Sequence, residues 1–463
     1  MGNEWLSQSV MTMDTDCVMP LLSMEKMLSQ QFAWESNALS YPRNLPLVIK
    51  KAHGIMIMDV NGKQYIDALA GAGSLPLGHN HQDMLSSIKS VLDKGAPLHT
   101  LDLMTEEKFT FIECLFDSLP CAYRDQVKIQ FCGPTGADAV EAAIKLCKTA
   151  TGREGVISFS GAYHGMTQGT LSLMGNLEPK KDVLGLGGSV QFLPFPYDYR
   201  CPFGIGGDES VSIHLNYMEQ LLTDPESGVK KPSAIILEVI QGEGGVIVAP
   251  DRWLRGVATL AKAHDIPLIV DEVQTGVGRS GYLYAFEKAG IQPDVIVLSK
   301  AIGGGLPMSV VIYKKHLDQW QPGAHAGTFR GNVLAMATGL SVIKHVQQKG
   351  FLADVRRKGY LLRSKLKALQ GKTDIIGDIR GEGLMVGVEI VNPQEPKDRM
   401  GHYPFDGARS VAIKKACFSR GLILENGGRF GSVLRFLPPL IITEEQIVQM
   451  LAIFHDAIME CSK

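Results

Sequence analysis

A lysine followed by three glycines is the part of this sequence best suited to covalent chemistry. Lys300 stands in the segment LSKAIGGGLPMSV, directly after an apolar run that ends at Leu298. Glycines let the backbone approach a ligand closely. A lysine in apolar surroundings can lose its proton and form a Schiff base. On this segment alone, Lys300 could equally be a solvated loop residue.

An aspartate follows a second apolar run. Asp271 ends the run PLIVD in the segment PLIVDEVQTGVGRSG. A carboxylate buried there is costly without a partner. A protonated pyridine nitrogen is a suitable partner, because the ring can then accept electrons from a carbanion. The alternative is a helix N-cap, where aspartate is common.

Two further segments could bind the rest of a flat, phosphorylated molecule. In FCGPTGADAVEAAIKLCKTA, a Gly-rich turn joins an apolar run to a helical pattern. Free N–H groups at Gly136 and Ala137 would form an anion site at the start of that helix. Tyr163 follows the run GVISF and could stack on a ring. Taken singly, such a turn can bind nothing, and such a tyrosine can be an ordinary packing residue.

The histidines and cysteines predict neither a metal site nor a disulfide framework. His79 and His81 are two residues apart in a predicted loop, without a third ligand nearby. The eight cysteines contain no CxxC pair. We therefore expect no metal ion and reduced or buried thiols.

These segments need a sheet that presents its strand ends at one edge. The apolar runs VKIQFC, GVISF, SAIILEV, PLIVD and DVIVLS alternate with helical patterns such as Ala137–Ala150 and Trp253–His264. Runs without polar alternation are typical of a parallel sheet buried on both faces. Ligands bind at the carboxyl ends of such strands. The sequence therefore predicts an α/β fold with the site at that edge.

The two ends of the chain have other patterns. Asn61-Gly62 between short β-like runs indicates a hairpin, and about the first 35 residues suggest an arm or docking helix. After Gly331, long helical patterns alternate with short strands near Met385–Ile390 and Val433–Leu437. We expect three parts: residues 1–75, an N-terminal arm with part of a small domain; residues 76–330, a large cofactor-binding domain; and residues 331–463, the rest of a smaller α+β domain.

The composition favours small-molecule partners. Of 463 residues, 45% are hydrophobic and 20% charged, which is typical of a globular protein. With 46 basic and 48 acidic residues, the chain has no basic surplus for nucleic acid or an anionic membrane. Neither a signal peptide nor a membrane-spanning segment is visible, which predicts a cytoplasmic location.

Taken together, these segments resemble the class III aminotransferases of fold type I, which include ornithine, acetylornithine and 4-aminobutyrate aminotransferases. The blocks DEVQTGVGRSG and SKAIGGGLP are specific in combination, and EVIQGEGG, GTFRGN and LRFLPPL follow in the family's order. The resemblance covers nearly everything after residue 40. It implies a large domain with a mostly parallel sheet, a smaller α+β domain, and pyridoxal 5′-phosphate as cofactor.

The resemblance assigns roles to individual residues. Lys300 resembles the lysine that holds the cofactor as a Schiff base and serves as general base, and Asp271 the partner of the ring nitrogen. Gln274 resembles the partner of the ring hydroxyl. The remaining cofactor contacts are the phosphate cup, the stacking aromatic and a phosphate contact from the neighbouring subunit, which are Gly136 with Ala137, Tyr163 and Thr328. The last implies a homodimer with shared active sites.

Two charged residues carry the substrate prediction. Glu243 and Arg435 match a pair that serves as a switch in relatives that handle both a terminal amine and glutamate. With the pair closed, an amine-bearing end can enter; with it open, Arg435 can bind a carboxylate bidentately. The alternative is a structural salt bridge.

The segments SYPRNLPLVIKKAHG, LPLGHNH, FCGPTGADAVEAA and HAGTFRGNVLAMATG are most similar to the branch that transfers the terminal amino group between 2,4-diaminobutyrate and 2-oxoglutarate. Aspartate 4-semialdehyde and glutamate would be the products. Since one methylene contributes only about 1–3 kcal/mol to discrimination, 4-aminobutyrate, ornithine or lysine are alternative donors. An aminomutase or decarboxylase of the same fold is a further alternative.

Overall fold

The computed structural model describes residues 23–462 except 124 and 188. The chain divides into two compact units: the N-terminal segment to Lys51 together with Met58–Gln64, and the remainder. In the first unit, α1 (Met24–Trp34) begins after the N-cap Ser23, and α2 (Tyr41–Asn44) follows. The predicted arm or docking helix is thus helical over α1, and its first 22 residues lie outside the described part.

Short strands follow, and the chain turns tightly between the second and third of them. These are β1 (Ile49–His53), β2 (Met56–Asp59) and β3 (Gln64–Asp67), and β3 also pairs in parallel with β15 (Leu422–Ile423). At the turn, the N–H of Gly62 donates to the carbonyl oxygen of Asp59 at 3.1 Å, and Gly62 has φ +86°. Glycine adopts this conformation without strain. The Asn61-Gly62 pair therefore marks a turn between strands, as predicted.

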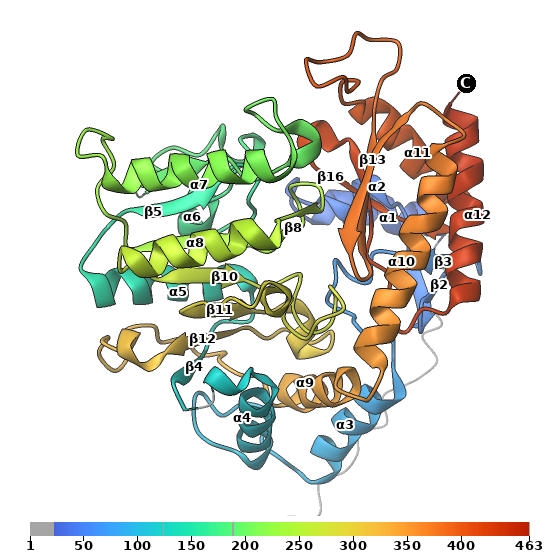
Figure 1. The fold of residues 1–463 in the computed structure, drawn as a ribbon. Helices are drawn as coiled ribbons and strands as arrows, with labels where there is room; N and C mark the ends of the chain where they lie inside the picture. The colour runs from blue at the N-terminus through green and yellow to red at the C-terminus, as the bar shows by residue number, and fades with distance from the viewer. Residues whose placement is uncertain (1–22, 124, 188, 463) are drawn as a thin grey trace, which may run out of the picture. The chain divides into compact units, whose positions relative to one another are not determined.

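A seven-stranded sheet lies at the centre of the second unit (Figure 1). The strand order is β4-β12-β11-β10-β7-β5-β6, and every neighbouring pair is parallel except the two that β12 forms. In that order, the strands are Val127–Phe131, Val310–Lys314, Val295–Leu298, Leu268–Asp271, Ala234–Glu238, Val156–Phe159 and Val190–Leu193. The five apolar runs of the sequence form five of the six mutually parallel strands, so the predicted mostly parallel sheet is confirmed.

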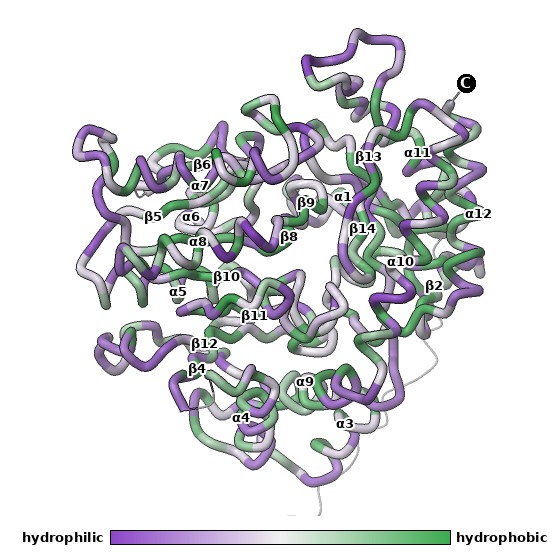
Figure 2. Tube along the Cα trace, viewed as in Figure 1, coloured by the Kyte–Doolittle hydropathy of each residue, from purple (hydrophilic) through white to green (hydrophobic). Residues whose placement is uncertain are grey.

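Both faces of this sheet are apolar, and helices cover them. Ile269 and Val297 belong to the hydrophobic cluster that contains α5 (Gly136–Thr151), whereas Val270 and Ile296 belong to the cluster that contains α8 (Asp251–Ala263). Figure 2 shows green, hydrophobic stretches along the central strands, and α8 carries both green and purple segments. Period-two alternation between two buried faces explains why these strands contain no polar alternation.

Four parallel strands end where the chemistry-bearing residues begin. In the register of the sheet, Asp271 at the end of β10 is level with Glu238 of β7 and Val297 of β11. Lys300 follows β11 after one residue, and Tyr163 follows β5. Because these strands run in the same direction, their carboxyl ends present these side chains at one edge.

A second sheet lies in the C-terminal part. It is antiparallel, with strands β13 (Ile376–Glu382), β14 (Met385–Ile390), β17 (Val433–Phe436) and β16 (Glu425–Gly427) in that order. The accompanying helices are α10 (Phe351–Gln370), α11 (Gly407–Ser419) and α12 (Glu444–Cys461). This confirms the predicted smaller α+β part.

The remaining elements connect these sheets. The other helices are α3 (Gln82–Asp93), α4 (Glu106–Ser118), α6 (Gln168–Ser172), α7 (Gly207–Thr223) and α9 (Val333–Val346), and the strands β8 (Ile240–Gln241) and β9 (Ile247–Val248) pair with each other. Short 3₁₀ segments occupy Cys121–Tyr123, Glu178–Lys180, Asp198–Arg200, Ala285–Ala289, Lys300–Gly303, Lys315–Leu317 and Arg429–Gly431. The segment from Gly185 to Gly207 is rich in glycine and proline, which is typical of a loop, and it also contains β6, a strand too short to show a pattern there.

The cysteines and the hydropathy of the helices can be compared with the expectations from composition. Seven cysteines of the described part are free, and Cys17 lies outside it. Within residues 23–462, no helix combines the length and apolar character needed to cross a bilayer.

Candidate active site

A cavity of about 290 Å³ opens at the carboxyl edge of the large sheet. Seven of the nine residues predicted for the site line it: Gly136, Ala137, Tyr163, Glu243, Asp271, Gln274 and Lys300. The other two residues do not line it. Arg435 is buried and contacts the lining residue Glu243, whereas Thr328 lies elsewhere. A larger cavity, about 490 Å³, lies beside Tyr197 and Arg380, but its charged groups are largely paired with one another.

Lys300 is held in a strained backbone conformation at the cavity wall. Its φ is +47°, in the left-handed region, which costs a lysine about 1–3 kcal/mol. Among the described residues, its Nζ has no hydrogen-bond or ion-pair partner. Burial lowers the pKa of Lys300, although the carboxylates of Glu243 and Asp271 act in the opposite direction. A lysine with a lowered pKa and no partner is a suitable nucleophile and base.

Asp271 faces the cavity as a buried carboxylate. It is 4% exposed; its Oδ1 accepts from the N–H of Val273 at 3.0 Å, and its Oδ2 lies 2.7 Å from Nδ1 of His164. Burial by itself lowers the pKa of His164, but the hydrogen bond and charge of Asp271 outweigh it, so the pKa is raised. In the described chain no helix begins at Asp271, so it is not the helix N-cap considered as the alternative.

Glu238 and His164 are site residues that the sequence argument did not single out. Burial raises the pKa of Glu238 to about 7, and nearby Asp271 adds to this. The two carboxylate oxygens of Glu238 accept from the N–H groups of Tyr163 and Gly242, each at 3.0 Å. Glu238 thus links the segment that carries Tyr163 to the segment that carries Glu243. Its position at the end of the run SAIILEV, level with Asp271, was the available signal.

The start of α5 forms the opposite end of the cavity. The N-cap Thr135 accepts from the N–H of Asp138 at 3.2 Å, whereas the N–H groups of Gly136 and Ala137 have no acceptor in the described chain. A Cβ added at Gly136 would lie 3.0 Å from Val273. Free N–H groups at the start of a long helix suit a phosphate, and only glycine leaves the space.

Gln274 offers an unused acceptor. Its Nε2 donates to the carbonyl oxygen of Ala72 at 3.4 Å, while its buried Oε1 has no partner in the described chain. A buried acceptor without a donor is rare in folded proteins. A ligand hydroxyl would satisfy it, so cavity size, free N–H groups, Asp271 and Gln274 together fit a pyridoxal 5′-phosphate molecule.

Glu243 and Arg435 form the predicted pair. Nη1 and Nη2 of Arg435 donate to Oε1 and Oε2 of Glu243 at 2.6 and 3.0 Å. Arg435, on β17, is 1% exposed, whereas the Glu243 side chain is 36% exposed. Glu425 lies 3.7 Å away as a second carboxylate. The bidentate geometry closes off the guanidinium in this structure.

Thr328 lies apart from the cavity of its own chain. It is exposed, and its carbonyl oxygen lies 3.2 Å from Nε2 of His99. Neighbouring Phe329 and Leu101 are 71% and 51% exposed. The role predicted for Thr328, a phosphate contact to a second subunit, remains a prediction.

The structure corrects one argument about histidines. His81 was predicted to lack a third ligand nearby, but Asp83 and His345 of α9 place their ligand atoms within 4.8 Å of it and of each other. Long-range packing of α3 on α9 cannot be read from local spacing. The Nδ1 of His81 already accepts from the N–H of Asp83 at 3.3 Å, and His345 lies 3.0 Å from the Asp83 carboxylate.

Comparison with known proteins places this site in a family. The family model described as aminotransferase class-III matches residues 39–458. The diaminobutyrate–2-oxoglutarate aminotransferase of Rhizobium meliloti is 54% identical over 91% of this chain and 90% of its own length. The protein with the same description in Haemophilus influenzae is 48% identical over 98% and 99%. The chain therefore belongs to the class III aminotransferases.

A solved structure supports the fold. An amine transaminase from an uncultivated Pseudomonas species, described in its PLP-bound form, superposes with a TM-score of 0.81 at 26% identity. The superposition covers 92% of this chain and 97% of that one. The large sheet and the smaller α+β part together have the fold type I architecture that the sequence predicted.

Proposed function

We propose that the protein transfers the terminal amino group of L-2,4-diaminobutyrate to 2-oxoglutarate, reversibly, giving L-aspartate 4-semialdehyde and L-glutamate. The cofactor is pyridoxal 5′-phosphate. The observation that carries the proposal is one cavity that contains Lys300 without a partner, the buried carboxylate of Asp271, and the closed Glu243–Arg435 pair. The two close relatives that act on this substrate pair support the choice of substrates.

Different residues of the cavity would bind different groups of the cofactor. Lys300 would hold it covalently through Nζ, and Asp271 would pair with the ring nitrogen, while the contact with His164 orients the Asp271 carboxylate. The hydroxyl of the ring is assigned to Gln274, and the face of the ring to Tyr163. The phosphate is assigned to the free N–H groups at the start of α5.

Lys300 also moves the proton. When bound, the cofactor supplies a protonated ring that accepts the electrons released at the amine-bearing carbon. As the general base, Nζ of Lys300 would take and hold the proton from that carbon. The burial that lowers the pKa of Lys300 favours the neutral amine, which is the form that acts as a base.

Glu243 and Arg435 let one site accept two kinds of substrate. The reacting end of diaminobutyrate carries no carboxylate, so the closed pair leaves no unpaired cation beside it. Glutamate carries a carboxylate on its reacting carbon, and an opened pair lets Arg435 bind it bidentately. The 36% exposure of Glu243 gives this side chain room to move.

We further propose a cytoplasmic homodimer in which Thr328 completes the phosphate site of the partner subunit. Its exposure and its distance from its own cavity support this arrangement. A mixed dimer of Lys300→Ala and Thr328→Ala subunits tests it, because one of its two sites would contain both intact residues. Recovery of activity on mixing, with neither variant active alone, supports sharing, and no recovery argues against it.

The test of the reaction is a donor comparison. Purified protein is given 2-oxoglutarate with diaminobutyrate, 4-aminobutyrate, ornithine or lysine, and glutamate is quantified. The proposal expects the highest kcat/KM with diaminobutyrate. A higher value with another amine would transfer the assignment to that donor, and rearrangement or carbon dioxide release without glutamate would indicate an aminomutase or decarboxylase.

A further inference from the structure

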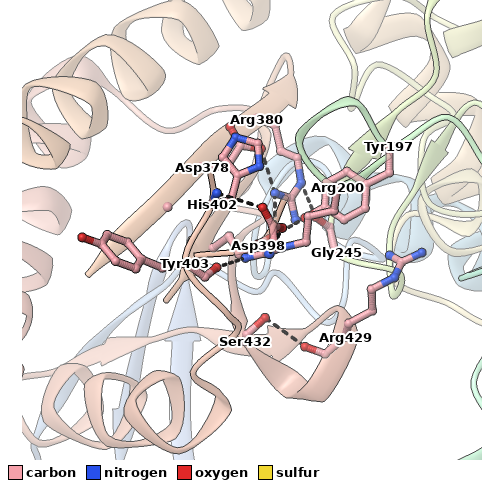
Figure 3. A network of polar contacts seen from close by, with 12 residues as sticks. Tyr197, Arg200, Gly245, Asp378, Arg380, Asp398, His402, Tyr403, Arg429 and Ser432 are labelled. Carbon is pink, nitrogen blue, oxygen red and sulfur yellow. Dashed lines mark hydrogen bonds and ion pairs between the residues drawn. The ribbon is translucent and has the colours of Figure 1, made fainter. Parts of the chain in front are cut away.

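Arg429 is a half-buried cation with no carboxylate within ion-pair distance in the described chain. It begins the 3₁₀ segment Arg429–Gly431 (Figure 3). Its guanidinium lies 5.1 Å from the centre of the Tyr197 ring, and Nη1 lies 3.5 Å from the carbonyl oxygen of Gly244. Burial lowers the pKa of Arg429. A desolvated guanidinium held only by a carbonyl and a ring is an incomplete anion site.

The neighbouring arginines of the same network are paired, which sets Arg429 apart. Arg380 donates to Asp378 at 2.9 Å and to Glu389 at 3.0 Å, and Arg200 donates to Glu389 at 2.6 Å. Arg380 lies over the same Tyr197 ring, at 4.8 Å. The carboxylates of this network are therefore engaged elsewhere, and the charge of Arg429 is left for a ligand.

Arg429 contacts a segment that adjoins a residue of the active-site cavity. Gly244, which it contacts, follows Glu243 directly, and a Cβ added at Gly161 would lie 3.4 Å from its Nη2. Gly161 precedes Tyr163 by two residues, and both Glu243 and Tyr163 line the cavity. The guanidinium thus sits beside two wall segments, and glycines keep the space around it open.

The cavity needs a cation that its own lining does not supply. Among the described lining residues, Lys300 is the only lysine or arginine, and it is consumed by the chemistry; His164 is paired with Asp271. Arg435 is closed off by Glu243. Met166, at the cavity edge, is apolar and 56% exposed. A carboxylate at the far end of a substrate would have no counter-charge from these residues.

The two proposed substrates share such a carboxylate. In diaminobutyrate, three carbon–carbon bonds separate the reacting carbon from the carboxylate carbon, and the same number separates the α-carbon of glutamate from its side-chain carboxylate carbon. One fixed cation can therefore serve both half-reactions, while the Glu243–Arg435 pair handles the group that differs. In ornithine the corresponding separation is one bond longer.

We propose that Arg429 binds this distal carboxylate in both half-reactions and so selects for ω-amino acids of the diaminobutyrate length. This inference rests on the proposed function. Arg429 is a substrate-binding residue in it and takes no part in the proton transfer.

The test compares substrates that differ only in the distal carboxylate. Diaminobutyrate is paired with 1,3-diaminopropane, which lacks it, and glutamate with L-2-aminobutyrate, for wild type, Arg429→Gln, Arg429→Lys and the surface control Arg252→Gln. Because a charge-assisted bidentate contact is lost, kcat/KM of Arg429→Gln should fall by about 10- to 100-fold for diaminobutyrate and glutamate. The ratio of kcat/KM for diaminobutyrate to that for 1,3-diaminopropane, and the ratio for glutamate to that for L-2-aminobutyrate, should fall by the same factor. Arg429→Lys should lose less.

Two results would overturn the inference: equal losses on both members of each pair, which indicate a structural role, or no loss on any substrate. Thermal unfolding and visible absorption of the bound cofactor show whether Arg429→Gln folds; if it does not, Arg429→Lys must still alter the two ratios. If wild-type protein does not react with diaminobutyrate, the proposed function fails, and the pair of glutamate and L-2-aminobutyrate still decides the role of Arg429.

Discussion

Removing the Glu243 carboxylate should shift the enzyme toward carboxylate-bearing substrates. In the structure, Glu243 holds both terminal nitrogens of Arg435, at 2.6 and 3.0 Å. Such a charge-assisted pair contributes about 1.5–3 kcal/mol, and 2-oxoglutarate must disrupt it before Arg435 can bind. The pair therefore lowers the apparent affinity for the oxo acid by about 10- to 100-fold.

In Glu243→Ala that penalty is absent. We expect KM for 2-oxoglutarate and for glutamate to fall by up to about 10- to 100-fold. The kcat/KM for diaminobutyrate should also fall, because an unpaired Arg435 would face its amine-bearing end. Glu425, 3.7 Å from Arg435, still offers a counter-charge, so the loss of stability should stay near about 1–2 kcal/mol. Steady-state kinetics on both half-reactions measure this, with Glu243→Gln as the isosteric control. Unchanged KM values in both variants would show that the pair is only structural.

Three further outcomes follow from the same geometry. Lys300→Ala should fold but lose turnover, because no other described amine lines the cavity; steady-state assays would contradict this by finding substantial activity. Asp271→Asn should lower kcat by orders of magnitude through loss of the charge that holds the ring proton, and a near-normal rate would remove that role. Burial raises the pKa of Glu272 to about 7 from 4.5, so its contribution to stability is present below about pH 4.5 and is lost as pH rises through 7. Glu272→Gln should reduce the change in unfolding free energy between pH 5 and 8 by up to about 3 kcal/mol. Denaturant titration at several pH values measures this, and an unchanged pH dependence would refute the assignment.

Local patterns predicted the elements that carry the chemistry. Buried strands without polar alternation and Gly-rich turns are visible in the sequence, so β10, β11 and the start of α5 were recognised. The strand β6 and the antiparallel strand β12 were not, because nothing local reveals a short strand among glycines or the direction of its neighbours.

Long-range packing sets the parts of the site that the sequence missed. The roles of Glu238 and His164 depend on the register of β7 and β10. That register places the carboxylates of Glu238 and Asp271 at one edge of the sheet, where His164 contacts Asp271. The approach of His345 to His81 likewise depends on how α3 packs on α9. The proposed boundaries after residues 75 and 330, and the contact of Thr328 with a partner subunit, stay predictions.

The visible absorption spectrum of the purified protein tests the central claim most directly. It is recorded before and after addition of diaminobutyrate and then of 2-oxoglutarate, with glutamate quantified in parallel. The account predicts a cofactor band that disappears with the diamine, returns with the oxo acid, and is accompanied by glutamate. A band that ignores diaminobutyrate would contradict the substrate assignment, and the absence of any band would contradict the enzyme assignment.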